Sequence, residues 1–219
     1  MTQRTENPHD SAFVPAVADE LEHLSLEEIA KCNRHGNQAR ALDLPCGDGH
    51  HSLAMAELGA QVLAIDNEAY GKQVRARALG ASLRDLLVFQ SGSLPQPGAL
   101  GDKAYDVIFC HHGLHTLPYK DAKTAVKQLL KHLKIGGKLF LSTYGLYSEL
   151  GDTYADREET ILSRFGPLDA AVAQKYNLPG PVCLYSERDL FLLILESGGG
   201  VLRTFTTTYG SVKGVAVRI

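Results

Sequence analysis

Two features of the sequence have the residue types and spacing to bind a nucleoside. The stretch Asp-Leu-Pro-Cys-Gly-Asp-Gly at 43–49 contains Gly47 and Gly49, which allow backbone N–H groups to approach a ligand closely. Asp66 lies 19 residues after Gly47, and an acid about 20 residues beyond such a loop is placed to accept hydrogen bonds from ribose hydroxyls. We therefore predict a nucleoside site. In the alternative interpretation, the glycines only make a tight turn and Asp66 caps a helix.

The type of nucleoside is restricted by the acids in and before the glycine loop. Asp43 and Asp48 place negative charge where the pyrophosphate of a dinucleotide would lie, and Ser52 stands where the dinucleotide motif has its third glycine. An NAD-linked oxidoreductase is therefore disfavoured. The same charge suits a ligand that carries a cationic amine or sulfonium as well as a carboxylate.

Five of the nine histidines fall in two loops that are expected to meet at one edge of the sheet. They are His50, His51, His111, His112 and His115. Three interpretations stay open: His111 or His112 acts as a general base or orients an acceptor, the imidazoles together bind a metal, or the cluster is structural. We predict His111 and His112 as the catalytic residues and no metal.

Composition excludes several classes of protein. The 219 residues have a net charge of −3 and no block of like charge, which disfavours nucleic acid and anionic membranes as partners. No apolar run approaches the roughly 20 residues of a membrane span, and the first ten residues do not have the apolar core of a secretory signal. Four scattered cysteines are expected to be reduced thiols in a cytoplasmic protein, and Cys46 and Cys110 to be buried apolar residues.

Short apolar runs alternate with helical stretches, which predicts an α/β fold with a doubly wound, mostly parallel sheet and helices on both faces. Strands are expected at 41–44, 61–65, 86–90, 105–110, 138–143, 201–208 and 212–219. Helices are expected from Pro15 to about Cys32 and at 51–58, 68–79 and 119–133, with a last helix capped by Ser186 and Asp189. Residues 145–185 follow no single period, and we expect short helices there that form a lid and, with part of the N-terminal helix, the acceptor site.

Several motifs, taken in order, resemble those of the class I S-adenosylmethionine-dependent methyltransferases over about residues 40–143. They are Asp-x-x-Cys-Gly-x-Gly at 43–49, Asp66, Tyr-Asp-Val-Ile at 105–108, Leu-His-x-Leu-Pro at 114–118 and Leu-Lys-Ile-Gly-Gly at 133–137. The resemblance implies a seven-stranded sheet whose last hairpin strand is antiparallel. It also implies a tail and helix at 1–40, followed by a Rossmann-like methyltransferase domain at 41–219.

The resemblance also implies which residues bind S-adenosylmethionine. Asp43 would orient the loop and the methionine amino group, and Asp66 would bind the ribose hydroxyls. Cys110 and His111 would flank the methionine end. The full cofactor-binding set is Asp43, Cys46, Gly47, Gly49, Asp66, Asn67, Ser91, Ser93, Cys110 and His111.

Three features depart from the family pattern, and one of them, Ile135 in place of a common proline before the fifth strand, is expected to be harmless. Pro45 replaces the usual first glycine of the loop, and Ser91 and Ser93 stand where the family often has an acid near the adenine. The expected activity is methyl transfer to a small-molecule acceptor by a monomer or homodimer. A non-catalytic nucleoside-binding module on the same fold is the alternative.

Overall fold

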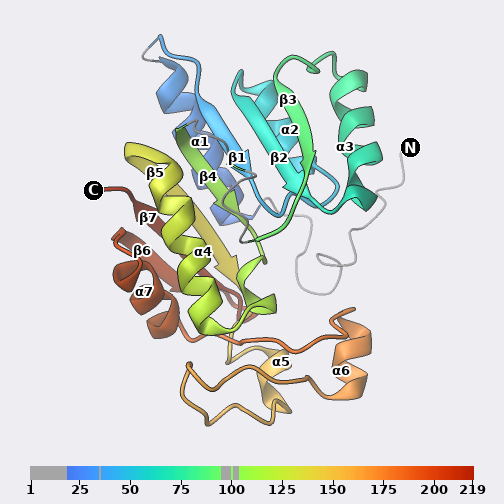
Figure 1. Cartoon of the computed structure of the whole chain (residues 1–219), viewed down its shortest axis with the longest axis vertical. Coiled ribbons are helices and arrows are strands. Elements are labelled where there is room, and N and C mark those ends of the chain that lie inside the picture. The colour runs from blue at the N-terminus through green and yellow to red at the C-terminus, as the bar shows by residue number, and fades with distance from the viewer. Residues whose placement is uncertain (1–18, 35, 95–99, 101–103) are drawn as a thin grey trace.

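Seven strands form one mixed sheet in the order β3-β2-β1-β4-β5-β7-β6 (Figure 1). The computed structural model describes residues 19–34, 36–94, 100 and 104–219. The strands are β1 (Arg40–Asp43), β2 (Gln61–Asp66), β3 (Leu87–Ser91), β4 (Tyr105–Cys110), β5 (Leu133–Thr143), β6 (Gly200–Thr206) and β7 (Val212–Val217).

The order of the strands determines where a ligand can bind. Strands β1 to β5 are mutually parallel where they pair, and β7 is antiparallel to both β5 and β6, as predicted. From β1 the chain crosses to β2 on one side, and β4 then returns to the other side. In open α/β sheets, ligands bind beyond the carboxyl ends of strands at such a reversal. The gap between the β1 and β4 loops is therefore the expected site.

Helices cover both faces of the sheet, and α4 and α7 lie in front of it in Figure 1. The helices are α1 (Glu20–Arg34), α2 (His50–Glu57), α3 (Glu68–Gly80), α4 (Tyr119–His132), α5 (Glu149–Asp152), α6 (Ala170–Lys175) and α7 (Glu187–Glu196). Leu42 of β1 packs in the core under α4 and α7, whereas its neighbour Ala41 packs in the core under α1, α2 and α3. Because successive strand residues face opposite sides, burial on both faces explains the uniformly apolar strands.

Most predicted elements lie within two residues of the observed ones, with one clear exception. The fifth strand was expected to begin at Lys138 after a turn at Gly136, but β5 already begins at Leu133. Gly136 has a φ of +79°, and the register with β4 shifts between Tyr105 and Val107. The irregular bend is therefore inside the strand pairing and not before it. The start of the first predicted helix lies outside the described residues.

Residues 145–185 contain the predicted short helices, α5 and α6, and lie below the ends of β4 and β5 in Figure 1. They have a small core that includes Tyr154 and Tyr176, and Tyr144, directly after β5, packs in it as well. Buried Arg164 connects this segment to α7, since it donates hydrogen bonds to Asp189 Oδ2 at 2.8 Å and to the Leu184 carbonyl at 3.1 Å. Tyr144, Tyr154 and Tyr176 are thus packing residues. None of the described helices is both long and apolar enough to cross a membrane.

The first turn of α7 has the predicted capping box. The Asp189 backbone N–H donates to Ser186 Oγ at 3.1 Å, and the Ser186 backbone N–H donates to Asp189 Oδ2 at 2.8 Å. Two N–H groups that a helix start leaves unpaired are thereby satisfied.

Replacing Ser186 by alanine should lower the free energy of unfolding by about 1 kcal/mol, because the Asp189 N–H loses its acceptor. Urea denaturation measures the change. Arg188→Ala, at an exposed position of the same helix, is the matched control and should stay within about 0.5 kcal/mol of the wild type. Equal losses in both variants would contradict the capping role.

Candidate cofactor and active site

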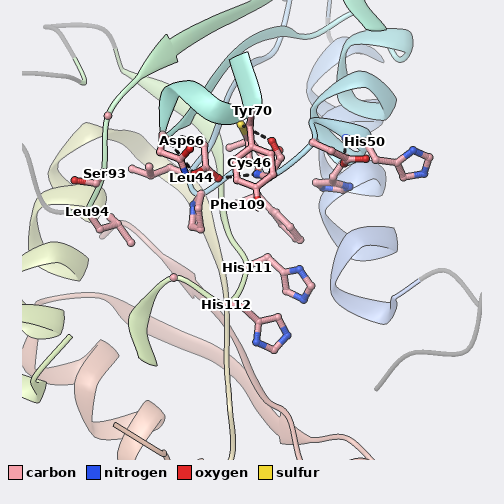
Figure 2. A pocket seen from close by; sticks show the side chains of 18 of the residues that line it. Leu44, Cys46, His50, Asp66, Tyr70, Ser93, Leu94, Phe109, His111 and His112 are labelled. Carbon is pink, nitrogen blue, oxygen red and sulfur yellow. Dashed lines mark hydrogen bonds between the residues drawn. The ribbon is translucent and has the colours of Figure 1, made fainter. Parts of the chain in front are cut away.

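A cavity of about 400 Å³ lies at the carboxyl ends of β1, β2 and β4, where the strand order reverses. Figure 2 shows its wall, with Asp66, Cys46 and Tyr70 at one end and the rings of His111 and His112 at the other. The volume falls in the usual range for small-molecule and cofactor sites. Of the predicted site residues, the lining contains Asp43, Cys46, Gly47, Asp66, Asn67, Ser93, His111 and His112.

The glycine loop crosses from the end of β1 to the end of β2. Cys46 donates its backbone N–H to the Ile65 carbonyl at 3.0 Å. Gly47 and Gly49 have φ values of +52° and +78°, a region that favours glycine. A Cβ on Gly49 would lie 2.8 Å from a methyl carbon of Val74. Gly49 therefore lets α2 start close against α3, and it is not among the lining residues.

Asp66 and Gly47 meet at the same cavity, which the nucleoside prediction requires. Asp66 Oδ2 accepts the Gly47 N–H at 2.8 Å, and Oδ1 accepts the Asn67 N–H at 2.7 Å. Asn67 also caps α3 by accepting the Ala69 N–H. The side-chain amide of Asn67 also donates to Oδ1, at 3.2 Å. The carboxylate is thus held at the end of β2 by Gly47 and Asn67, and Oδ2 has a further lone pair for a ligand hydroxyl.

Asp43 is a second carboxyl group in the cavity wall, and it is almost fully buried. Burial raises its pKa from the ordinary value of 3.8 to about 7, against the opposing effect of a 2.5 Å hydrogen bond from Ser52 Oγ. A buried carboxyl near its pKa at neutral pH gains from a cationic neighbour. Ser52 stands where the dinucleotide motif has its third glycine, and its hydroxyl connects α2 to Asp43.

The other acid of the glycine loop is already paired. Asp48 makes an ion pair with Arg77 of α3 and accepts the His50 backbone N–H at 3.1 Å. Because Arg77 neutralises Asp48, the acids near the glycine loop that remain for a cationic ligand are Asp43 and Asp66.

Three predicted cofactor residues lie outside the cavity wall: Gly49, Ser91 and Cys110. Ser91 is exposed at the end of β3, and Cys110 is fully buried. Burial raises the pKa of the Cys110 thiol to about 12 and raises that of Cys46 as well. Both thiols are protonated at neutral pH, as expected for buried apolar cysteines rather than a redox pair.

Several lining residues were not predicted from the sequence. Tyr70, Leu94 and Phe109 supply apolar surface, and Glu22 brings α1 into the wall. Tyr70 stands three residues after the capping Asn67, so its place beside the glycine loop could have been derived from helix periodicity. Part of the first helix was expected at the acceptor site, but nothing local to Glu22 or Phe109 singles out these two residues. Which residue of α1 and which ring of β4 reach the cavity depends on how the helix packs against the sheet. No residue of 145–185 is among the lining residues, so an acceptor role for that segment stays a prediction.

The five histidines occupy different environments. His51 is 8% exposed, has its Nε2 2.9 Å from Ser25 Oγ, and packs on Phe109 with ring centroids 4.1 Å apart. Burial and the charge of His111 lower the pKa of His51 to about 3, so it is neutral and joins α1 to α2. His115 is 1% exposed and packs edge-on against Tyr144. These two fit the structural interpretation.

His111 and His112 are neighbours on the loop after β4. Their ring centroids are 4.2 Å apart, and His112 also packs on Tyr144 at 4.4 Å. His112 has a φ of +50°, and its N–H donates to Ser142 of β5. Burial and the charges of His111 and His115 lower the pKa of His112 well below its ordinary value. Within the part of the chain that the structure describes, no group of three or more His, Cys, Asp or Glu side chains is arranged to hold a metal.

The strand order is that of the α/β methyltransferase fold, and the cavity lies where the order of its strands reverses. Residues 42–141 match the family model described as "Methyltransferase domain", and this part of the chain is similar to the class I S-adenosylmethionine-dependent methyltransferase family.

Curated relatives match the same region. The ubiquinone biosynthesis O-methyltransferase of Xanthomonas oryzae is 37% identical over 106 residues, which cover 48% of this chain and 43% of that protein. The protein of the same description from Idiomarina loihiensis is 37% identical over 105 residues, 48% of this chain and 42% of that one. The chain thus matches less than half the length of these relatives.

Solved structures agree on the fold. An O-methyltransferase family protein from Burkholderia thailandensis has a TM-score of 0.64 at 16% identity, covering 90% of this chain and 56% of that one. Magnesium protoporphyrin IX methyltransferase from Synechocystis, solved with bound S-adenosylhomocysteine, has a TM-score of 0.58 at 21% identity, covering 90% of this chain and 83% of that one.

S-adenosylmethionine is the methyl donor of this family, and the residues of the cavity fit it. Asp66 offers acceptors for ribose hydroxyls, Tyr70 and Leu94 offer apolar surface, and buried Asp43 offers a carboxylate for a cationic amine or sulfonium. We expect these residues to hold the cofactor.

Replacing Asp66 by alanine should weaken S-adenosylmethionine binding at least tenfold, about 1.4 kcal/mol, because the ribose loses its acceptors and the glycine loop loses its anchor. Calorimetric titration measures the affinity. Asp85→Ala, an exposed acid before β3, is the control and should bind as the wild type does. Unchanged affinity in the Asp66 variant would refute the ribose role.

Cofactor affinity should also depend on the ionisation of Asp43. Because its pKa is about 7, the carboxylate is protonated at lower pH, so the cationic cofactor should bind more weakly at about pH 6 than at about pH 8. Binding near pH 7 should release protons, measured as a dependence of the binding heat on the buffer. In Asp43→Asn, affinity should be weaker and this proton release reduced.

Folding stability gives an independent check on Asp43. A carboxyl whose folded pKa lies above its unfolded value binds more protons in the folded state between about pH 4 and 7, so its contribution to stability falls as pH rises. The stability of Asp43→Asn relative to the wild type should therefore increase over that range. A flat difference would contradict the raised pKa.

Proposed function

We propose that this chain is a methyltransferase that transfers a methyl group from S-adenosylmethionine to a hydroxyl of a small aromatic acceptor. The proposal is supported chiefly by the meeting of Asp66 with Gly47 at the cavity, with the imidazoles of His111 and His112 in the same wall. The names of the relatives that match half of the chain support oxygen as the acceptor atom.

The cavity also supports an aromatic acceptor. Phe109 lies between the glycine loop and the histidines in Figure 2, its ring centroid is 5.7 Å from that of His111, and the His111 and His112 centroids are 4.2 Å apart. Flat apolar surfaces hold a planar ring by stacking and burial. Holding the acceptor in line with the methyl group and excluding water supplies much of the rate of such a reaction.

When bound, S-adenosylmethionine supplies an electrophilic methyl group on a sulfonium, which departs as the neutral thioether. A hydroxyl acceptor must lose its proton as its oxygen takes the methyl group, and a neutral imidazole is suited to accept that proton near neutral pH. His111 is the better candidate of the two neighbours, because burial makes the imidazole of His112 a weak base. We assign His112 to holding the acceptor ring and His111 to accepting the proton.

The activity is tested by incubating the chain with S-adenosylmethionine and catechol, with veratrole, whose two hydroxyls are already methylated, as the control acceptor. S-adenosylhomocysteine and a singly methylated product, detected by mass spectrometry, are expected with catechol and absent with veratrole. Tight cofactor binding without product from any hydroxylated aromatic would favour the non-catalytic binding module instead.

His111→Ala should lower kcat at least about tenfold and lower the affinity for S-adenosylmethionine by a smaller factor, because the imidazole takes the acceptor proton although it also flanks the methionine end of the cofactor. His112→Ala should raise KM for the acceptor more than it lowers kcat. Steady-state kinetics and calorimetry separate the two effects. If both variants keep the wild-type kcat, the general-base role is wrong.

A further inference from the structure

A buried carboxylate at the start of α1 lies next to His111. Asp19 directly precedes the helix, and its side chain is 6% exposed. Its Oδ1 accepts the Leu21 N–H at 2.8 Å, which caps α1. The cap places the carboxylate in a constant position relative to the helix axis.

The same carboxylate is paired with a buried cation from the far end of the chain. Lys213 lies in β7, its side chain is 7% exposed, and its Nζ is 2.5 Å from Asp19 Oδ1. In the sheet, Lys213 is the direct partner of Ser142, which accepts the His112 N–H. Lys213 therefore anchors Asp19 to the strands that carry the histidine loop.

The second oxygen of Asp19 faces the catalytic candidate. Asp19 Oδ2 is 3.5 Å from His111 Nε2, and the His111 side chain is 16% exposed. Burial alone would raise the pKa of Asp19, but the hydrogen bonds and charges of His111 and Lys213 outweigh it and hold that pKa well below its usual range. The group is a carboxylate at every pH at which an imidazole titrates. Catalytic hydrogen bonds are often this long before a substrate binds.

We propose that Asp19 is a positioning residue for His111: anchored by Lys213, its carboxylate accepts the Nε2–H of His111 and so leaves Nδ1 as the basic nitrogen. This inference rests on the proposed function. The acceptor O–H bond breaks as its proton forms an N–H bond at Nδ1, and the resulting imidazolium faces the Asp19 carboxylate. A ring nitrogen that donates to a carboxylate determines which tautomer is present, so the acceptor this arrangement fits is one that must lose a proton, such as a phenol.

Other charged or titratable groups also act on this network. They are Glu22 of α1, Asp43 of β1, His51 of α2 and His112 of the loop after β4. Asp43 interacts with His111 through charge alone, whereas Asp19 forms the ion-pair contact. Removal of Asp19 should therefore change which ring nitrogen of His111 carries the proton, and the charge of Asp43 should not compensate for the lost contact.

The test reads the His111 ring by nitrogen-15 NMR in the absence of acceptor. In the wild type at neutral pH, Nε2 should carry the proton and Nδ1 should not. The variant Asp19→Ser with Lys213→Met keeps a helix cap and leaves no buried charge unpaired, but serine is too short to reach His111. This variant should show mixed tautomers, and Asp19→Asn with Lys213→Met should restore the wild-type tautomer in part.

Catalysis gives the second measurement. The serine variant should lose at least about tenfold in kcat towards catechol, while its affinity for S-adenosylmethionine changes less than about threefold. A wild-type His111 protonated at Nδ1, a tautomer unchanged in the serine variant, or equal losses in kcat and cofactor affinity would each overturn the inference. A wild-type His111 protonated at Nδ1 overturns the inference even if the variants do not fold.

Failure of the proposed function is distinguishable from failure of this inference. If the chain methylates no hydroxylated aromatic while the tautomer responds to Asp19 as expected, the acceptor assignment is wrong and the positioning contact holds. If methylation occurs and the tautomer is insensitive to Asp19, the function holds and the positioning role is wrong.

Discussion

The hydrogen bond from the Gly47 N–H to the Asp66 carboxylate is the interaction on which the rest of the site depends. It joins the loop after β1 to the end of β2 at a distance of 2.8 Å. The bond forms only because β1 and β2 are adjacent and parallel, so that the loop can cross the neighbouring strand end, where Cys46 also bonds to Ile65. It holds the backbone close to the carboxylate while leaving lone pairs for a ligand.

The acids of the site have separate roles because their partners differ. Asp48 is neutralised by Arg77, and Asp66 is stabilised by backbone donors. Asp43 accepts a hydrogen bond from the Ser52 hydroxyl, and burial keeps its pKa at about 7. A buried carboxyl in this condition is costly in the free protein and favourable beside a cation. This electrostatic imbalance matches the positive charge of the cofactor used by the family.

Packing gives the histidines of the site different contacts and different basicities. His51 is neutral and structural, His115 is buried against Tyr144, and the pKa of His112 is lowered by burial. His111 differs from these three because a buried ion pair, Asp19 with Lys213, lies beside it. The two charges come from opposite ends of the chain and meet only because β7 inserts between β5 and β6.

Local sequence determined the strands, most helix ends, the α7 cap, the glycine loop and the place of Asp66, since all of these follow from short-range periodicity, turn residues and spacing. The tertiary structure decided which residues reach the cavity. Gly49 and Cys110 turned out to be packing residues, whereas Phe109 lines the cavity. The partners of His111 likewise depend on strand order and on helix docking. Strand order and helix docking cannot be derived from the spacing of neighbouring residues, because contacts between residues far apart in the sequence form only when the whole core packs.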